Sequence, residues 1–230
     1  MSGADVNSSG AGETGTTPNW QGQTAAPTRI VLLRHGQTAL SVERRYSGRG
    51  NPELTELGQQ QAAAAGRRIA SGALGTIDAV VSSPLARTMA TAHAAADALG
   101  LPVQEFDGLI ETDFGDWEGL TFREAADRDG ELHRNWLSDV DIAPPGGESF
   151  AQVAERIAAA RADLVADYAG RTVLAVSHVT PIKTLLRDAL SVGPELLFRL
   201  HLDLASICVV EYFPDGGSVV RLANDTAHLQ

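Results

Sequence analysis

The 230-residue sequence has little of what marks secreted or membrane proteins. Its single cysteine, Cys208, cannot form an internal disulfide, so a reducing compartment is the simplest location. No run of about 18 apolar residues occurs, and the N-terminus lacks the charged and apolar regions of a secretory signal. We therefore expect a cytoplasmic protein with no membrane partner.

Positive charge is also scarce, because 18 lysines and arginines face 29 aspartates and glutamates, which gives a net charge of −11. Such a chain offers no electrostatic basis for binding a polyanion, and we do not expect direct nucleic-acid binding by this domain. The exception is a local cluster of arginines: Arg34, Arg44, Arg45 and Arg49. On an acidic protein, that reversal of sign suggests either a site for a small anion or a solvated basic loop.

The chain divides into three parts by composition. Residues 1–28 are rich in Gly, Ser, Thr, Ala and Pro and almost lack large apolar side chains, so a disordered tail or linker is predicted there. Residues 29–223 form one domain, which suits the length of the chain. Residues 224–230 are predicted to be a short C-terminal tail.

Strand and helix patterns alternate through residues 29–223. Strands are predicted over 29–33, 78–82, 172–176, 206–213 and 218–222, the last two as a hairpin. Helices are predicted over 55–71, from Ser83-Pro84 to Leu99, after capping boxes at Thr121 and Ser149, and over 181–190. This alternation predicts an α/β fold in three layers, α/β/α, with a mainly parallel central sheet covered on both faces.

Polar residues follow three of the predicted strands, at the edge where parallel sheets bind ligands. The first strand ends in Arg34-His35-Gly36, the second leads into Ser83 and Arg87, and the third ends in Ser177-His178. Two arginines and two histidines can surround one anion at such an edge. Arginine holds phosphate oxygens in a bidentate fork, and neutral imidazole is nucleophilic near neutral pH. A second imidazolium can stabilise charge on the oxygens during phosphoryl transfer.

Five segments, in this order, resemble the histidine phosphatase superfamily in its phosphoglycerate-mutase-like branch. They are LRHGQT (33–38), GNPELTELG (50–58), VSSPLAR (81–87), LIETDFGDWEG (109–119) and Ser177-His178. The resemblance covers nearly all of residues 29–223. Within the family, the chain is most similar to α-ribazole phosphatases of cobalamin biosynthesis and to mycobacterial acid phosphatase domains that follow a ribonuclease H domain. The linker over 1–28 suits the second arrangement.

The resemblance implies roles for individual residues. His35 is the expected nucleophile, and Glu111 the expected general acid that later acts as base on water. The expected phosphate-binding residues are Arg34, Arg87 and His178. No metal and no cofactor are implied.

Two positions depart from the family pattern. Ser41 stands where many relatives carry Asn, and Val179 where relatives have Gly. Ser41 reaches less far than Asn, while Val179 keeps its backbone N–H but narrows the mouth of the pocket. Ser41, Ser47 and Val179 are secondary candidates for the site.

The implied function is a metal-independent acid phosphatase that hydrolyses a small phosphate ester through a phosphohistidine. Fusion to a ribonuclease H domain and assembly into a homodimer are left open. A phosphoglycerate mutase and a phosphate-binding regulatory module without turnover are the alternatives. The module has no use for the proton donor Glu111, and the cations between Glu111 and Pro144 are few for a mutase: Arg123, Arg128 and Arg134. The acidic residues from Glu105 to Glu118 lack a fixed ligand spacing, so they are more simply interpreted as solvated than as a Mg²⁺ site.

Overall fold

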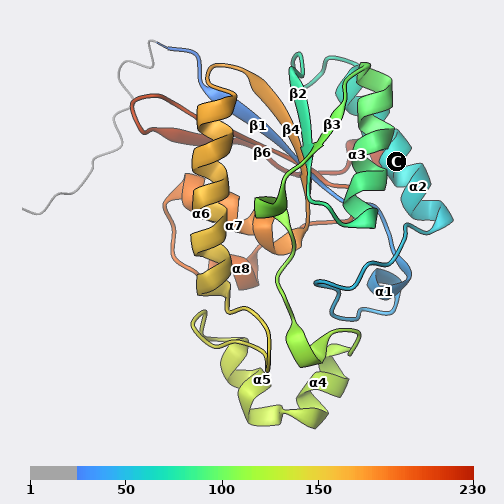
Figure 1. Ribbon diagram of the computed structural model, residues 1–230, viewed down its shortest axis with the longest axis vertical. Helices are drawn as coiled ribbons and strands as arrows, with labels where there is room; N and C mark the ends of the chain where they lie inside the picture. The colour runs from blue at the N-terminus through green and yellow to red at the C-terminus, as the bar shows by residue number, and fades with distance from the viewer. Residues whose placement is uncertain (1–24) are drawn as a thin grey trace, which may run out of the picture.

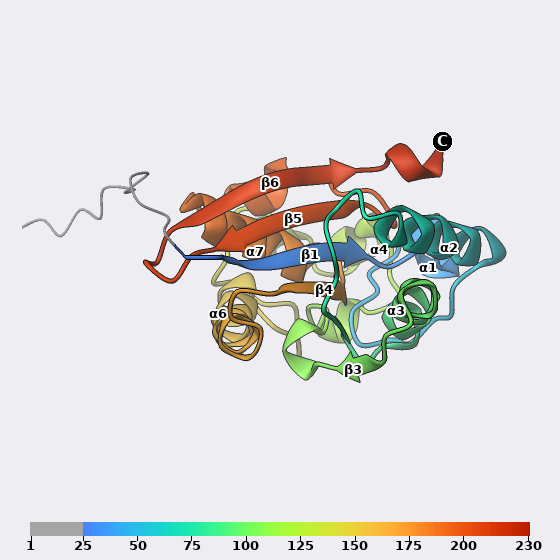
Figure 2. The same cartoon turned by 90° about the horizontal axis from the view of Figure 1, so that it is seen from above.

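The computed structural model describes residues 25–230, so most of the linker predicted over 1–28 lies outside the described residues. A six-stranded sheet forms the middle layer, with helices on both faces (Figures 1 and 2). The strands are β1 (Thr28–Arg34), β2 (Ala79–Ser82), β3 (Val103–Glu105), β4 (Thr172–Ser177), β5 (Ile207–Tyr212) and β6 (Ser218–Asp225). The helices are α1 (Ala39–Val42), α2 (Glu56–Ala70), α3 (Ala86–Leu99), α4 (Phe122–Arg128), α5 (Gly130–Trp136), α6 (Phe150–Asp167), α7 (Val179–Leu190) and α8 (Leu196–Arg199). Short 3-10 turns span Asp107–Leu109, Gly115–Trp117 and Ala227–Leu229.

The order of the strands in the sheet is β3-β2-β4-β1-β5-β6. β1 pairs in parallel with β4, and β4 with β2, whereas β5 and β6 form the predicted antiparallel hairpin. The mainly parallel sheet predicted from the sequence is therefore confirmed. In the β1–β4 register, Arg34 lies opposite Ser177, so the next residues along the two strands, His35 and His178, emerge side by side.

Alternate residues of the strands face opposite layers, as the pleat requires. Ile30 and Leu32 of β1 pack in one cluster with residues of α6 and α7. Val31 and Leu33 pack in the other cluster, with residues of α2 and α3. The central strands are buried on both faces, which explains their continuous apolar runs.

Beyond the carboxyl ends of the parallel strands, α4 and α5 form a separate region built on aromatic residues (Figure 1). Its buried cluster contains Tyr46, Phe114, Trp117, Trp136 and Phe150, among others. The Tyr46 hydroxyl is 2.8 Å from Nε2 of His133 inside this cluster. The region forms one wall of the site described below.

Two predicted helix starts are wrong. α3 begins at Ala86 rather than at Ser83-Pro84, and its N-cap Leu85 makes no side-chain hydrogen bond. The Ser83 hydroxyl is instead 2.8 Å from Nε2 of His178, so it is committed to the site rather than to the helix end. α7 begins two residues before Pro181, since proline is tolerated in a first turn, where the backbone N–H needs no helical partner.

Several short elements carry no strong sequence signal and were not predicted: β3, α1, α5 and α8. Within residues 25–230, the structure has no helix both long and apolar enough to cross a bilayer.

Candidate active site

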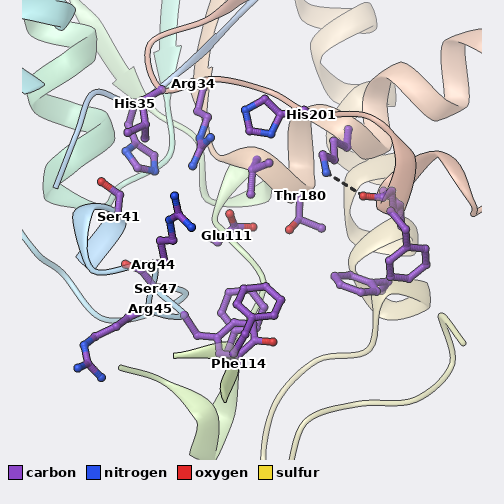
Figure 3. A pocket seen from close by; sticks show the side chains of 18 of the residues that line it. Arg34, His35, Ser41, Arg44, Arg45, Ser47, Glu111, Phe114, Thr180 and His201 are labelled. Carbon is purple, nitrogen blue, oxygen red and sulfur yellow. Dashed lines mark hydrogen bonds between the residues drawn. The ribbon is translucent and has the colours of Figure 1, made fainter. Parts of the chain in front are cut away.

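The three predicted strand ends converge on one buried site. Arg34 ends β1 and His35 follows it, His178 caps α7 directly after β4, and Arg87 lies in the first turn of α3. The rings of His35 and His178 meet edge to face, with centroids 5.2 Å apart. Glu111, on the segment between two 3-10 turns, is also buried. Figure 3 shows Arg34, His35 and Glu111 around the same space.

His35 is held in one tautomer. Its Nδ1 lies 2.8 Å from the carbonyl oxygen of Gly36. Because a carbonyl only accepts hydrogen bonds, Nδ1 carries the proton and Nε2 carries the free lone pair. Burial, together with the charges of Arg34 and Arg87, lowers the pKa of His35 well below its ordinary value. The lowered pKa favours the neutral form of the ring near neutral pH.

Gly36 is required by a close contact between backbones. A Cβ added at Gly36 would lie 2.4 Å from the carbonyl oxygen of Gly58, which is too close. A Cβ at Gly58 would in turn lie 2.1 Å from the carbonyl oxygen of Gln37. The two glycines thus let the backbone that follows His35 pack directly against the first turn of α2.

Arg87 is fully buried and bound to a loop rather than to a carboxylate. Its guanidinium donates to the carbonyl oxygens of Gly50 (2.8 Å), Gly48 (2.9 Å) and Ser47 (3.1 Å). The carboxylate of Glu118 holds the same loop from the other side, accepting from the N–H groups of Gly48 and Gly50 at 2.9 Å each. Glu118 thus orders the loop that orients Arg87.

His178 and Arg34 complete the basic group. Burial and the charge of Arg87 lower the pKa of His178 well below its ordinary value, and its Nδ1 has no hydrogen-bond partner. Arg34 donates to the carbonyl oxygen of Leu202 at 2.5 Å. Burial lowers the pKa of Arg34 and of Arg87, although both remain cationic because an arginine side chain stays protonated in proteins.

Glu111 is positioned by a second, partly buried network. Its Oε1 accepts from the backbone N–H of Thr112 at 2.8 Å. Arg156 of α6 donates to the carbonyl oxygens of Gly108 (3.0 Å) and Ile110 (2.8 Å), which fixes the segment that carries Glu111. Glu148 accepts from Arg156 and from the N–H of Asp113. Sequence reasoning missed Arg156, Glu148 and Glu118 as supports of the site.

The secondary candidates all line the cavity, but they differ in what they can offer. Ser41 is occupied locally, since its hydroxyl donates to the Thr38 carbonyl and accepts from the Thr38 N–H. The hydroxyl of Ser47 is buried without a partner, and Val179 begins α7 at the cavity wall.

The cavity has a volume of about 680 Å³ and extends from His35 to the aromatic region. Arg44, from the arginine cluster of the sequence, lines the cavity, and so does Lys183 of α7, which was not predicted for the site. Burial lowers the pKa of Lys183, whose Nζ donates to the Leu197 carbonyl. His201 is exposed and stands at the cavity mouth.

The sequence cluster of arginines divides in two. Arg34 and Arg44 line the cavity without an ion-pair partner among the described residues, and Arg45 also lines it. Arg45 pairs with Glu43 and Glu124, and Arg49 pairs with Glu148. Only part of the positive charge of this arginine cluster is therefore free to face an anion.

The acidic stretch is not a metal site in the described residues. No group of three or more His, Cys, Asp or Glu side chains between residues 25 and 230 is placed to hold a metal ion. Its members have separate partners instead: Glu118 holds the loop at Gly48, Asp116 pairs with Arg128, and Asp113 lies 3.8 Å from Arg49.

Known proteins include relatives that are similar to this chain in sequence. The family model described as "Histidine phosphatase superfamily (branch 1)" matches residues 30–225. The chain is 58% identical over 219 residues to the "Bifunctional protein Rv2228c" of Mycobacterium tuberculosis, covering 95% of this chain but only 60% of that protein. It is 31% identical to a 2,3-bisphosphoglycerate-dependent phosphoglycerate mutase of Parvibaculum lavamentivorans, with 85% of this chain and 95% of the mutase covered.

Solved structures of phosphatases share the fold. A mycobacterial glucosyl-3-phosphoglycerate phosphatase in complex with VO3 superimposes with a TM-score of 0.78 at 31% identity, covering 86% of this chain and 100% of that one. A putative α-ribazole-5′-P phosphatase from Escherichia coli K-12 gives a TM-score of 0.77 at 27% identity, covering 86% and 96%.

Proposed function

Because the chain belongs to the histidine phosphatase superfamily (branch 1), we propose that it is a metal-independent phosphomonoesterase that works through a phosphohistidine on His35. The observation that carries the proposal is the state of His35. Its ring is neutral, fixed in the Nδ1–H tautomer by Gly36, and surrounded by Arg34, Arg87 and His178.

In the first half-reaction, the lone pair of Nε2 attacks phosphorus and the bond from phosphorus to the ester oxygen breaks. Arg34 and Arg87 neutralise the phosphate and orient its oxygens. Glu111 donates its proton to the departing alkoxide, so that an alcohol leaves. The Gly36 carbonyl, at 2.8 Å from Nδ1, stabilises the positive charge that the ring acquires.

In the second half-reaction, the carboxylate of Glu111 takes a proton from water as the water oxygen attacks phosphorus. The P–N bond breaks, its electron pair returns to Nε2, and inorganic phosphate leaves. His178 lies beside His35 and can stabilise charge on the transferred group in both steps.

Hydrolysis is favoured over mutase activity by the charges around the cavity. A mutase must hold an acidic, twice-phosphorylated intermediate, which calls for several unpaired cations. Of the arginines between Glu111 and Pro144, Arg123 and Arg128 pair with aspartates, and none of the three lines the cavity. Steady release of phosphate is therefore expected to exceed 3- to 2-phosphoglycerate interconversion.

The lowered pKa of His35 favours activity on the acid side of neutrality. A histidine with its ordinary pKa of about 6.5 would be mostly protonated at pH 5 and would lose its nucleophilic lone pair. Burial and the two neighbouring arginines lower the pKa of His35, so its ring keeps the lone pair to a lower pH. This supports the acid phosphatase interpretation.

One candidate substrate is α-ribazole phosphate, which the similarity to the Escherichia coli protein supports. This substrate would give the protein a role in cobalamin biosynthesis. Because the chain spans 60% of the bifunctional mycobacterial relative, fusion to a further domain, such as ribonuclease H, is proposed for the full-length protein. We propose a cytoplasmic location and leave the homodimer open.

The deciding experiment is chemical trapping. Enzyme quenched after brief exposure to a ³²P-labelled monoester should carry an acid-labile, base-stable label that the His35→Ala variant lacks. Activity should survive excess EDTA. A label on serine or a carboxylate, or a complete loss in EDTA that Mg²⁺ restores, would refute the mechanism.

A further inference from the structure

One end of the cavity is lined by large apolar side chains that nothing in the described structure covers. Phe122, Leu137 and Phe198 are 51%, 39% and 40% exposed, and all three line the cavity. Exposed aromatic side chains at the rim of a pocket commonly mark a binding surface. Phe114 also lines this end, and Figure 3 shows it across the cavity from Arg34 and His35.

This apolar rim, defined by Phe122, Leu137 and Phe198, is held in place by the buried aromatic cluster beneath it. Phe122 stacks on Tyr46 with ring centroids 4.6 Å apart, and Phe198 meets Phe150 edge to face at 5.7 Å. The Tyr46 hydroxyl is in turn hydrogen-bonded to His133. A surface anchored in this way is preformed, so a ligand would lose little by ordering it.

The two arginines at α4, the helix that carries Phe122, are already paired. The Arg45 guanidinium lies 2.6 Å from the Glu43 carboxylate and 2.7 Å from that of Glu124. Arg128 is bound to Asp116. The half-buried Lys183 lies at the Phe198 side of the rim, because its Nζ donates to the carbonyl oxygen of Leu197, the residue before Phe198. At Phe122, where the neighbouring arginines are paired, a substrate carboxylate would be desolvated without a free counter-charge, whereas an apolar group would find a matching surface.

We infer that the preferred substrate is a phosphate monoester whose alcohol ends in an aromatic or similarly broad apolar group. The inference rests on the proposed phosphatase function: the phosphate lies at His35 and the apolar group covers the rim. A cavity of about 680 Å³ holds such a molecule, since pockets for drug-sized ligands measure about 300–1,000 Å³. The rim is continuous with the cavity that contains His35, which favours substrate over a protein partner as its occupant.

The test compares two esters that differ in the apolar group but share an alkyl leaving oxygen: 2-phenylethyl phosphate and ethyl phosphate. For wild type, kcat/KM should be at least tenfold higher for the phenylethyl ester, a difference of about 1.4 kcal/mol. In Phe122→Ser and Phe198→Ser this preference should fall severalfold, while kcat/KM for ethyl phosphate stays near wild type. Leu190→Ser, which alters a 47% exposed leucine outside the cavity, is the matched control and should keep the full preference.

The corresponding phosphonates separate this inference from the proposed function, because their binding requires no turnover. Calorimetry should show 2-phenylethylphosphonate binding wild type more tightly than ethylphosphonate, by a ratio that the rim variants reduce. A retained phosphonate ratio without hydrolysis would refute the phosphatase function but leave the rim assignment standing. The rim assignment would be overturned if wild type had equal kcat/KM for the two esters and equal affinity for the two phosphonates. Rim variants that change only the oligomeric state would also overturn it.

Discussion

Glu118 offers a sharp test of how the site is supported, because it lies outside the cavity lining. Its carboxylate accepts hydrogen bonds from the N–H groups of Gly48 and Gly50, and the carbonyl groups of the same loop bind Arg87. Replacing Glu118 with alanine leaves two N–H groups without their partner and removes the negative charge nearest the loop. The loop should then hold Arg87 less well, although no group in contact with the phosphate has changed.

The magnitude follows from the two hydrogen bonds. A bond to a charged group contributes about 1.5–3 kcal/mol when buried, and Glu118 is only half-buried, so water recovers part of the loss. We expect Glu118→Ala to lower the free energy of unfolding by about 2 kcal/mol, and Glu118→Gln, which keeps an acceptor oxygen, by about 1 kcal/mol. Displacing a positioned group by about 1 Å can reduce turnover roughly 100-fold, so a 10- to 100-fold loss of kcat/KM is expected for the alanine variant.

Urea unfolding gives the first quantity, and phosphate release from p-nitrophenyl phosphate gives the second. Glu53→Gln is the matched control, because Glu53 lies in the same region of the chain and is exposed. If Glu118→Ala unfolded as wild type does and turned over at full rate, the role assigned to the loop would be wrong. Lost stability with undiminished turnover would show that the loop does not orient Arg87.

Three further predictions concern the acid, its support and the buried histidines. Glu111→Gln should slow hydrolysis of alkyl phosphates by at least 100-fold, yet slow p-nitrophenyl phosphate much less, since nitrophenolate leaves without a proton; equal losses would exclude Glu111 as the acid. Arg156→Met should release the segment that carries Glu111 and so lower the ratio of alkyl phosphate to p-nitrophenyl phosphate turnover, as Glu111→Gln does. Arg156→Lys should recover part of this ratio, and an unchanged ratio in Arg156→Met would contradict the role of Arg156. Below about pH 6.5 the unfolded chain protonates His35 and His178 while the folded protein, with both pKa values lowered, does not. The free energy of unfolding should therefore decrease as the pH is lowered below about 6.5, by up to about 1.4 kcal/mol per pH unit for each histidine. In urea titrations at several pH values, His178→Asn should show a smaller dependence of this free energy on pH than wild type.

The sequence predicted that Arg34, His35 and His178 come together, because their proximity depends on local motifs and one rule of topology. Arg34, His35 and His178 each follow or end an apolar strand, and carboxyl ends of parallel strands meet at one edge. Given a parallel sheet, their proximity needs no further information. The start of α3 was predicted wrongly for a related reason: Ser83 has the features of an N-cap, but its hydrogen bond to His178 depends on tertiary structure.

The supporting residues could not be identified from motifs, since they act on backbone groups far along the chain. Arg156 bonds to carbonyl groups of the segment that ends at Glu111, and Glu118 to the loop before Asn51. For Arg156 one signal was available. It lies three and four residues from Val153 and Ala160, on the buried face of α6, where a cation requires internal partners.

The pairing of β1 with β4 and β5 also has a consequence for how the protein folds. β1 lies near the beginning of the chain, whereas both strands that flank it come from the C-terminal third. Such pairing gives a high contact order, because a long loop must close before the central strands can bond. His35 and His178 therefore cannot meet until most of the chain has been synthesised and the middle of the sheet has assembled. An oxyanion such as vanadate, held between them, would thus report completed folding rather than local structure.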